Sequence, residues 1–461
     1  MAQPETVQLG WVPPPVLRIA ARLGAAGHRV FLVGGAVRDH LLGREPADYD
    51  LGTSARPEAV LALFPQGLGD DVAFGRVLVD GTDVLTLRRE AEYRDLRRPS
   101  QVTFTTSVRS DLARRDFTVN AMALDLADGT LHDPFGGRAD LASGLLRTVG
   151  PAARRFGEDA LRVLRAVRLR AQLGMSYHPS LAAALQEAAP LLAAISAERV
   201  RDELQRTLVS PGCGLGLRDI TRHGLLAAVL PECLPMVGLA QPTPMHCYDV
   251  WEHSIHAVET IAPVPALRWA ALLHDSGKPA TVSRDAAGAT HFYGHERVGA
   301  ELASRLLRRL RLPERQISEI AALVRHHMFH YGPETKPGAA RRLILALGPQ
   351  GVRDLLELRR ADRQASRWGP GYGPEGEYLL EHLGRILAAG ERFGLTDLAV
   401  DGHDVMDILG MPPGPAVGRS LRTLHRLVLD EVLPNERTAL RARLAAGPLP
   451  EGDPAGDREA P

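Results

Sequence analysis

Two carboxylates placed two residues apart, Asp48 and Asp50, are the first side chains in this 461-residue sequence that could do chemistry. We expect the segment 48–51 to be a strand, on which side chains at positions i and i+2 share one face and can point at one spot. Two such carboxylates repel each other unless a cation lies between them, and hard oxygen ligands together with substrate phosphates suit Mg²⁺. A solvated edge strand is the alternative interpretation of this short pattern taken alone.

Two further segments could serve the same site. An apolar run at 30–33 leads into Gly34 and Gly35 and then into an expected helix at 36–42. Backbone N–H groups exposed at the start of such a helix favour an anion such as triphosphate, and Arg38 could reach the same phosphates. Farther along, the paired arginines of RRDFTVNA, Arg114 and Arg115, are expected to lead into a strand.

The segment GEDALRVLRAVR carries an acceptor and a donor that suit base recognition. Asp159 and Arg162 are i, i+3 neighbours if the segment is one helix. Cytosine and adenine both present an exocyclic amine beside a ring-nitrogen acceptor, which an Asp acceptor and an Arg donor complement. Uracil and guanine would leave both contacts mismatched, at about 1–3 kcal/mol for each unpaired buried group. Arg165 and Arg168 extend the same face toward phosphate or base, and surface ion pairing is the alternative for all of these charges.

A second set of residues has the types that bind metal ions. An adjacent His-Asp pair ends the apolar segment 269–273, and further histidines lie before and after it. The set is His253, His274, Asp275, His295, one of the adjacent pair His326 and His327, and Asp362. A lone histidine in a helix is usually structural or exposed, so only the whole set indicates a metal site.

The elements that must position these residues change character along the chain. Strand and helix patterns alternate in the first third, with hairpins expected across Asp80-Gly81 and Asp128-Gly129. After about residue 140 the pattern is helical in period. We therefore expect an α+β fold, with a mixed or antiparallel sheet in front and all-α segments behind it.

Composition limits the classes that remain. The charges balance, with 55 basic and 55 acidic residues, so any nucleic-acid binding must come from local clusters. There are three cysteines without a CxxC pair, no long apolar run and no leader-like N-terminus. These features predict a cytoplasmic protein without disulfides or a membrane span.

Five ordered motifs, GGAVRD, DYD, RRDFTVNAMA, DPFGGRADL and GEDALRVLRAVR, resemble the class II CCA-adding enzyme and bacterial poly(A) polymerase family over about residues 28–210. The resemblance implies that Gly35 and Arg38 hold the incoming triphosphate and that Asp48 and Asp50 bind catalytic Mg²⁺. It implies that Arg114 contacts the nucleotide near its ribose or phosphates. It also makes the pair Asp159 and Arg162 an amino-acid template that selects C and A. A third carboxylate is not obvious, and Glu90 and Glu92 are guesses for it.

Three other segments are similar to parts of this family. Residues 93–99 resemble the flexible loop that helps the switch from C to A addition. Residues 196–204 resemble a motif that buttresses the templating helix. Residues 398–432 resemble the helical tail of family members with a His-Asp domain, and the resemblance implies a role in gripping tRNA.

The His-Asp set resembles the HD superfamily of metal phosphohydrolases over about residues 246–365. Its ligands would come from separate helices and hold one or two divalent metals, such as Mg, Mn, Ni or Co, that activate water. Of the two adjacent histidines we favour His327, from its spacing to Leu323 and Val324.

Together these features predict a template-independent tRNA nucleotidyltransferase that completes CCA ends with CTP and ATP, as a monomer or homodimer. The expected parts are a nucleotidyltransferase head at 1–150, a neck with the templating helix at 151–232, an HD domain at 245–370, a helical tRNA-binding tail at 371–446 and a disordered end at 447–461. Three alternatives remain open. They are an A-adding enzyme of a split CC/A pair, a poly(A) polymerase, and an HD nucleotide phosphohydrolase whose front domain only binds RNA.

Overall fold

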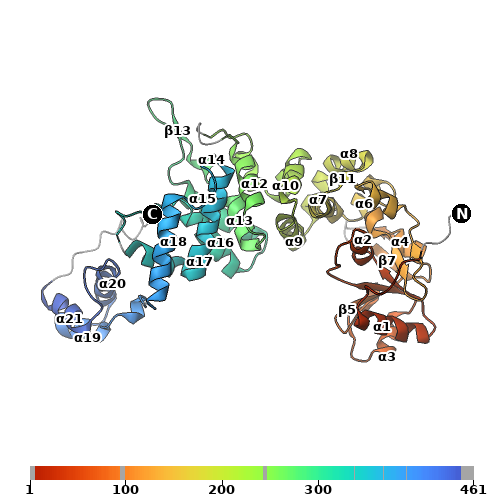
Figure 1. Ribbon diagram of the computed structural model, residues 1–461, viewed down its shortest axis with the longest axis horizontal. Coiled ribbons are helices and arrows are strands. Elements are labelled where there is room, and N and C mark those ends of the chain that lie inside the picture. The colour runs from red at the N-terminus through yellow and green to blue at the C-terminus, as the bar shows by residue number, and fades with distance from the viewer. Residues whose placement is uncertain are drawn as a thin grey trace. The chain divides into compact units, whose positions relative to one another are not determined.

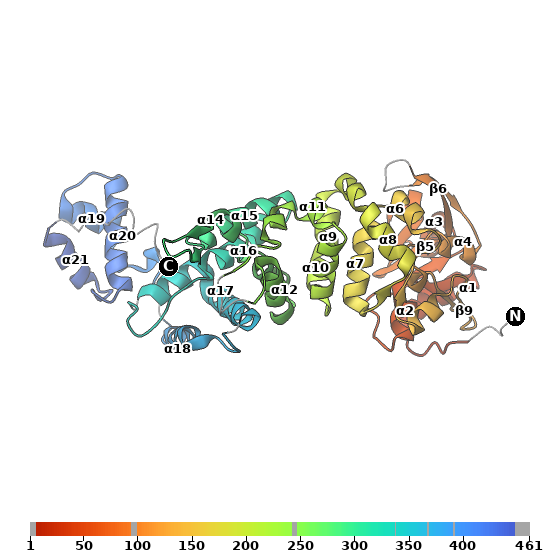
Figure 2. The ribbon, with the colours of Figure 1, turned by 90° about the horizontal axis from the view of Figure 1, so that it is seen from above.

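The computed structural model describes residues 6–93, 99–241, 247–336, 338–366, 368–390 and 392–447. It divides the chain into two compact units, Met1–Pro231 and Glu232–Pro461, each of which is described by itself (Figures 1 and 2). Most of the loop expected at 93–99 and of the disordered end expected at 447–461 lies outside the described residues. No helix in the described part of the chain is long and apolar enough to cross a bilayer.

The first unit is built on a seven-stranded sheet with the strand order β3-β4-β5-β2-β1-β8-β9. Its strands are β1 (Val30–Val33), β2 (Asp50–Thr53), β3 (Leu68–Asp71), β4 (Arg76–Val79), β5 (Thr82–Thr86), β8 (Ala123–Asp125) and β9 (Leu131–His132). β1 runs antiparallel to β2 and β8, whereas β2 and β5 are parallel. A separate hairpin pairs β6 (Arg88–Tyr93) with β7 (Pro99–Phe104).

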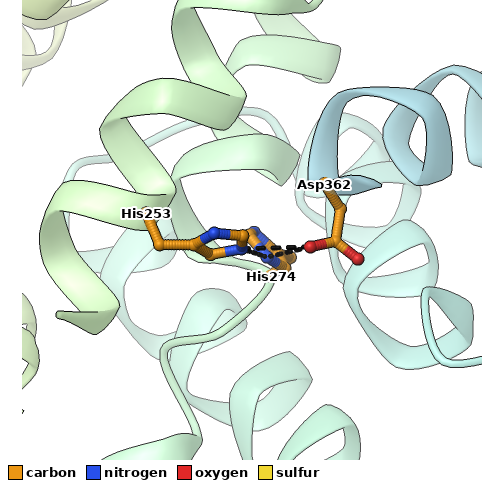
Figure 3. Close-up of side chains that lie close together, drawn as sticks. All are labelled: His253, His274 and Asp362. Atoms are coloured by element: carbon orange, nitrogen blue, oxygen red, sulfur yellow. Dashed lines mark hydrogen bonds and ion pairs between the residues drawn. The ribbon is translucent and has the colours of Figure 1, made fainter. Parts of the chain in front are cut away.

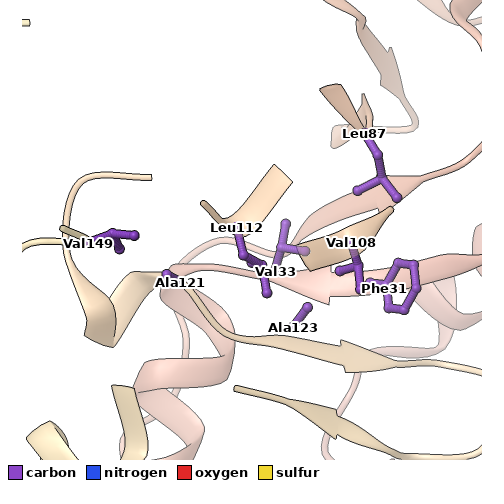
Figure 4. Close-up of a cluster of buried hydrophobic side chains, with 8 residues drawn as sticks. All are labelled: Phe31, Val33, Leu87, Val108, Leu112, Ala121, Ala123 and Val149. Carbon is purple, nitrogen blue, oxygen red and sulfur yellow. The ribbon is translucent and has the colours of Figure 1, made fainter. Parts of the chain in front are cut away.

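The central strand β1 is fully buried because all four of its residues are β-branched, aromatic or leucine. Its side chains Phe31 and Val33 belong to the core of the unit, shown in Figure 4. The rest of this core comes from residues far apart in sequence, Leu87, Val108, Leu112, Ala121, Ala123 and Val149. Burying these groups fixes the ends of β1 and β2, from which the candidate site residues project.

The first helices of this unit pack on the sheet, α1 (Pro14–Ala25) and α2 (Gly35–Leu41) against β1 and α3 (Pro57–Leu63) against β4, and the later helices form a separate helical region. The remaining helices are α4 (Val108–Leu112), α5 (Gly137–Ala142), α6 (Ala152–Glu158), α7 (Leu161–Leu173), α8 (Pro179–Glu187), α9 (Ala197–Leu208), α10 (Cys213–Arg222) and α11 (Leu226–Val229). A two-stranded parallel pair, β10 (Leu145–Leu146) with β11 (Ser176–Tyr177), interrupts the helices.

The second unit is almost entirely helical. Its helices are α12 (Val250–Thr260), α13 (Pro265–Leu273), α14 (Lys278–Thr281), α15 (His295–Arg309), α16 (Glu314–His326), α17 (Gly338–Ala365), α18 (Gly373–Ala388), α19 (Gly402–Leu409), α20 (Pro415–Leu429) and α21 (Arg437–Ala445). α12 packs against α13 and α17, and α13 packs against α16. The short hairpin of β12 (Ser283–Arg284) and β13 (Thr290–His291) projects between α14 and α15. The α+β fold expected from the sequence is therefore confirmed.

Three local expectations were wrong. The second strand begins at Asp50 rather than Asp48, so the two carboxylates do not share it. The segment after Arg115 forms a 3₁₀ turn at Thr118–Asn120 instead of a strand, since its polar groups are satisfied within the turn and by Arg147. The expected single helix through GEDALR breaks at Asp159, whose extended backbone (φ −145°) separates α6 from α7.

Candidate active sites

The first candidate site is a pocket of about 400 Å³ in the first unit, between the edge of the sheet and the helices α7 and α9. Among the described residues, eight arginines but only three aspartates line it. Its lining is Gly34, Gly35, Arg38, Asp50, Leu85, Arg88, Arg114, Arg115, Asp116, Asn120, Asp159, Leu161, Arg162, Arg165, Arg168 and Arg199. A cavity with this excess of guanidinium groups suits a polyanion such as a nucleotide triphosphate.

Negative charge gathers at one edge of this pocket. Asp50 begins β2, and the parallel pairing of Leu51 with Val84 places Asp83 of β5 next to it. Burial is the main cause that raises the pKa of the Asp50 carboxyl, and the charges of Asp83 and Asp48 raise it further, against the opposing effect of Arg115. These carboxylates therefore favour a cation beside them.

Asp83 is a further candidate for the third carboxylate, beside the two guesses Glu90 and Glu92. Glu90 lies between two arginines, 2.7 Å from Arg88 and 3.0 Å from Arg114, whereas Asp83 pairs with one arginine, Arg76, at 2.7 Å. The charge of Asp83 also raises the pKa of Asp50. The side chain of Glu92 lies outside the described residues. Asp83 was missed, although it lies two residues after the turn expected at Asp80-Gly81 and is the second residue of β5. Only the pairing of β2 with β5 identifies it, because nothing in the sequence says which strands are neighbours.

The glycine turn is shaped for close approach. Gly34 has φ +74° and ψ −122°, a backbone conformation that residues with a Cβ atom rarely adopt, and a Cβ atom there would also lie 2.7 Å from the Arg115 Nη1 atom. Arg38 lines the pocket one turn later and donates to the Asn120 Oδ1 atom at 2.7 Å and to its neighbour Asp39 at 2.8 Å. The structure thus brings Gly35 and Arg38 to the same pocket as Asp50.

Asp48 is the one predicted head residue that the structure keeps apart. It is exposed and precedes the strand, whereas Asp50 is half-buried at the pocket. Its charge still reaches Asp50, as one of the causes of the raised pKa. The loop before β2 therefore holds Asp48 near the carboxylate pair without packing it into the fold.

The expected template residues both line the pocket, from two different elements. The carboxylate of Asp159 accepts from the Leu161 backbone at 3.1 Å and from Arg199 at 2.8 Å. Arg162 donates to Glu158 at 2.6 Å and to the Arg114 carbonyl at 3.1 Å. The break between α6 and α7 lets the carboxylate stand at the start of α7 and the guanidinium one turn inside it. Acceptor and donor therefore face one cavity.

The remaining arginines are fixed by buried partners. Arg165 pairs with Asp116 at 2.6 Å, and Arg168 pairs with Glu203 of α9 at 2.6 Å. Burial alone would raise the pKa of Asp116, but Arg165 and Arg162 outweigh it and hold that pKa below its usual range. Arg199 and Glu203 both belong to α9, which thus supports the pocket wall, in keeping with the buttress expected at 196–204.

The second candidate site lies in the second unit, where the structure brings together all six residues of the expected His-Asp set. One group is His253, His274 and Asp362 (Figure 3). The His253 Nε2 atom lies 3.3 Å from the His274 Nε2 atom and 3.0 Å from the Asp362 Oδ1 atom. These residues come from α12, the end of α13 and α17, so helix packing alone assembles them.

The other group is Asp275, His295 and His327. The His295 and His327 Nε2 atoms lie 3.2 Å apart, and the Asp275 Oδ1 atom lies 3.4 Å from His295. Asp275 also reaches toward the first group, with its Oδ2 atom 3.3 Å from the His274 Nε2 atom. Asp275 can therefore bridge two metal positions.

Hydrogen bonds to the backbone orient three of the imidazole rings. The Nδ1 atoms of His274, His295 and His327 each lie 2.8 Å from the carbonyl three residues earlier. This arrangement turns every Nε2 atom inward, as metal-binding histidines require. His327 is buried in the cluster, whereas His326 lines a different, smaller cavity, which supports the choice of His327.

The charges of the cluster suit a bound cation. Burial lowers the pKa of His327 to about 3, with His274 and His295 adding to the effect, so this ring is neutral and can act as a ligand. Burial also disfavours charge on His274, but Asp275 and Asp362 outweigh it and raise its pKa to about 10. The two carboxylates thus favour positive charge beside them, and a bound divalent ion can supply this charge in place of a proton on His274. Four imidazoles and two carboxylates fit borderline divalent metals.

Comparisons with known proteins match both units of the chain. Four family models match the chain: a poly(A) polymerase head domain at 30–147, an RNA- and SrmB-binding site of polymerase A at 174–236, an HD domain at 245–363 and domain 2 of tRNA nucleotidyltransferase at 394–444. A CCA-adding enzyme of Geobacillus thermodenitrificans is 35% identical over 93% of this chain and 95% of its own length.

Two other proteins are informative. An A-adding tRNA nucleotidyltransferase of Deinococcus radiodurans is 38% identical over 90% of this chain and 95% of its own length. The solved structure of the Bacillus stearothermophilus CCA-adding enzyme in complex with CTP has 31% identity and a TM-score of 0.72, and covers 94% of this chain and 98% of its own.

Proposed function

This chain belongs to the family of CCA-adding enzymes, and we propose that it adds C and A to the 3′ ends of tRNA, using CTP and ATP. The observation that carries this proposal is one pocket in which Asp50, an arginine-rich wall and the Asp159–Arg162 pair meet, with Asp83 beside Asp50 on the neighbouring strand. No nucleic-acid template is needed, because the protein side chains select the base.

In this mechanism the chain's own residues divide the work. Arg38 and Arg114 bind the phosphates of the incoming nucleotide, and Gly34 lets the turn approach them closely. The Asp159 carboxylate accepts from the exocyclic amine of cytosine or adenine, and the Arg162 guanidinium donates to the ring nitrogen. Mg²⁺ held by Asp50, Asp48 and Asp83 would activate the 3′-hydroxyl and stabilise the leaving pyrophosphate. Asp83 thus joins the two predicted carboxylates.

Extension of three tRNA transcripts tests the proposal. The transcripts end at the discriminator base, at C and at CC, and each is given CTP, ATP or both. Growth of all three to CCA is the expected result. Extension of the CC-ended transcript alone, by ATP alone, would make the protein an A-adding enzyme like the Deinococcus radiodurans protein to which it is 38% identical. No pyrophosphate release with any transcript would refute both.

We also propose that the second unit is a metal-dependent phosphohydrolase, with Mg, Mn, Ni or Co bound by the six clustered residues. The two triads and their inward Nε2 atoms support this activity. The test is release of inorganic phosphate from p-nitrophenyl phosphate with each metal ion in turn. Activity that is absent with every metal, or that survives the double change His274→Ala and Asp275→Ala, would reject it.

Further assignments follow from these proposals. The head is 1–150, the neck 151–232, the HD domain 245–370 and the tRNA-binding tail 371–446. The family models that match at 30–147, 174–236, 245–363 and 394–444 support this division. The partners are tRNA, CTP and ATP, the protein acts as a monomer or homodimer, and its place is the cytoplasm.

A further inference from the structure

The pocket at the His-Asp cluster has an aromatic edge that metal binding does not explain. Its volume is about 820 Å³, and both Tyr293 and Trp368 line it. Tyr293 is 78% exposed and Trp368 is 52% exposed. Large aromatic side chains usually bury most of their surface. Two rings left open at one pocket are therefore available to a ligand.

Trp368 is tied to the helix that supplies a metal ligand. Arg363, next to Asp362 on α17, donates to the Trp368 carbonyl at 3.0 Å, and its guanidinium carbon lies 5.8 Å from the centre of the indole ring. Gly373, at φ +72°, makes room for this arginine, because a Cβ atom there would lie 2.7 Å from the guanidinium carbon. Arg363 thus acts as a positioning residue for the indole.

Tyr293 is tied to the cluster through the segment that leads into α15. It stands two residues before His295, and its ring stacks on His291 with centroids 5.1 Å apart and planes 10° apart. His291 is in turn held by Asp285 at 2.8 Å. The hairpin β12–β13 therefore presents this ring at the pocket while its exposed surface remains open.

A phosphate group at the cluster leaves most of the pocket unfilled. Pockets of roughly 300–1,000 Å³ accommodate whole drug-sized ligands, so 820 Å³ has room for a sugar and a base as well. Aromatic side chains bind bases of any sequence by stacking on their flat faces. Cationic groups in the same lining, Lys278 and Arg363, suit the negative charge of the phosphate.

We propose that Trp368 and Tyr293 bind the base of a nucleoside phosphate and so give the HD site its preference for nucleotides over phosphate esters without a base. This inference rests on the proposed phosphohydrolase activity. In the reaction the oxygen of one water forms a bond to phosphorus, the bond between phosphorus and the ester oxygen breaks, and that oxygen leaves with a proton. The nucleotide is either free or the 3′ end of an RNA, since both present the same group.

Kinetics of Trp368→Ala test the inference, with adenosine 3′-monophosphate, an RNA oligonucleotide ending in a 3′-phosphate, and glycerol 2-phosphate as substrates. We expect KM for the substrate that the site uses, free or RNA-bound, to rise about ten-fold with little change in kcat. KM for glycerol 2-phosphate should not change. Trp368→Phe should restore much of the affinity. Tyr248→Ala, which removes a 38% exposed ring outside this pocket, is the matched control.

Binding gives a readout that does not depend on turnover. The chain has four tryptophans, and adenosine stacked on Trp368 should quench a part of the fluorescence that Trp368→Phe lacks, with or without added Mn²⁺. Equal KM changes for all three substrates, or no change, would overturn the inference and leave the hydrolase proposal standing. If the wild type hydrolyses none of the substrates, the hydrolase proposal fails. The fluorescence measurement then tests the inference by itself: adenosine that quenches the wild type no more than it quenches Trp368→Phe would overturn it.

Discussion

The charges at and beside the head pocket are separated, with carboxylates at the edge of the sheet and guanidinium groups on the helices. Asp50 and Asp83 gather negative charge at the edge of the sheet, whereas the helices α7 and α9 present guanidinium groups. These charges affect one another: the pKa of Asp50, for example, is raised by burial and by its acidic neighbours. Substitutions that keep the shape and remove one charge are therefore the most informative.

Asp50→Asn and Asp83→Asn should each lower the rate of nucleotide addition, by about 100-fold or more for Asp50, because an amide is a poorer ligand for Mg²⁺. The measurement is extension of CC-ended tRNA with ATP over a range of Mg²⁺ concentrations. Asp80→Asn is the control, since Asp80 lies in the β4–β5 turn at φ +47°, where asparagine fits well. Full activity of Asp83→Asn would remove Asp83 from the metal site.

Asp159→Ala should weaken base selection more than it weakens catalysis. Without this carboxylate the exocyclic amine of cytosine or adenine loses its acceptor. Uracil and guanine, whose carbonyl oxygens would face the carboxylate, are then no longer disfavoured by it. We expect the preference for CTP over UTP to fall about ten-fold or more. Competition of the two nucleotides on tRNA ending at the discriminator base measures it. An unchanged preference would show that another group reads the base.

At the scale of elements, α9 holds the pocket wall through buried ion pairs. Glu203 is 4% exposed and neutralises Arg168, which is 9% exposed. Glu203→Ala would leave a buried guanidinium without its partner, and we expect it to lower the free energy of unfolding by about 3 kcal/mol. Urea unfolding measures the loss. Glu187→Ala, at an exposed position ending α8, should change stability by less than about 0.5 kcal/mol.

In the second unit, helix packing places one ligand set from α12, α13, α15, α16 and α17. A metal ion bound there should stabilise the folded state by about 2.7 kcal/mol at a concentration 100 times its Kd. We expect Mn²⁺ to raise the melting temperature, and His253→Ala to abolish the rise. His256→Ala is the matched control, because His256 lies one turn along the same helix and pairs with Glu259. An equal rise in both variants would place the ion elsewhere.

At the scale of the whole molecule, the chain joins two units that each contain a complete candidate site. Asp48→Ala with Asp50→Ala should abolish nucleotide addition and spare phosphate hydrolysis, whereas His274→Ala with Asp275→Ala should do the reverse. Both activities are measured on the full chain. Loss of both in either variant, with the protein still folded by circular dichroism, would contradict separate sites.

Much of the fold and of both candidate sites could be predicted from the sequence, because most of the site residues belong to short sequence motifs. The α+β head and the helical remainder follow from local periodicity, and the position of each histidine and aspartate in the HD set follows from spacing and resemblance. Glycine at position 34 and the hairpin across Asp80-Gly81 are also local properties, fixed by backbone conformation within a few residues.

Only the tertiary structure showed which residues from distant parts of the sequence are neighbours in space. Asp83 became a candidate site residue only when β5 paired with β2, and strand neighbours are set by the packing of the whole sheet. The helix break at Asp159 opposes the helical pattern of its segment, and the extended residue is held there by Arg199 from a distant helix. Likewise His253 meets Asp362 across 109 residues because α12 packs on α17. Local sequence determines which groups are available, whereas the burial of apolar faces determines which of them meet.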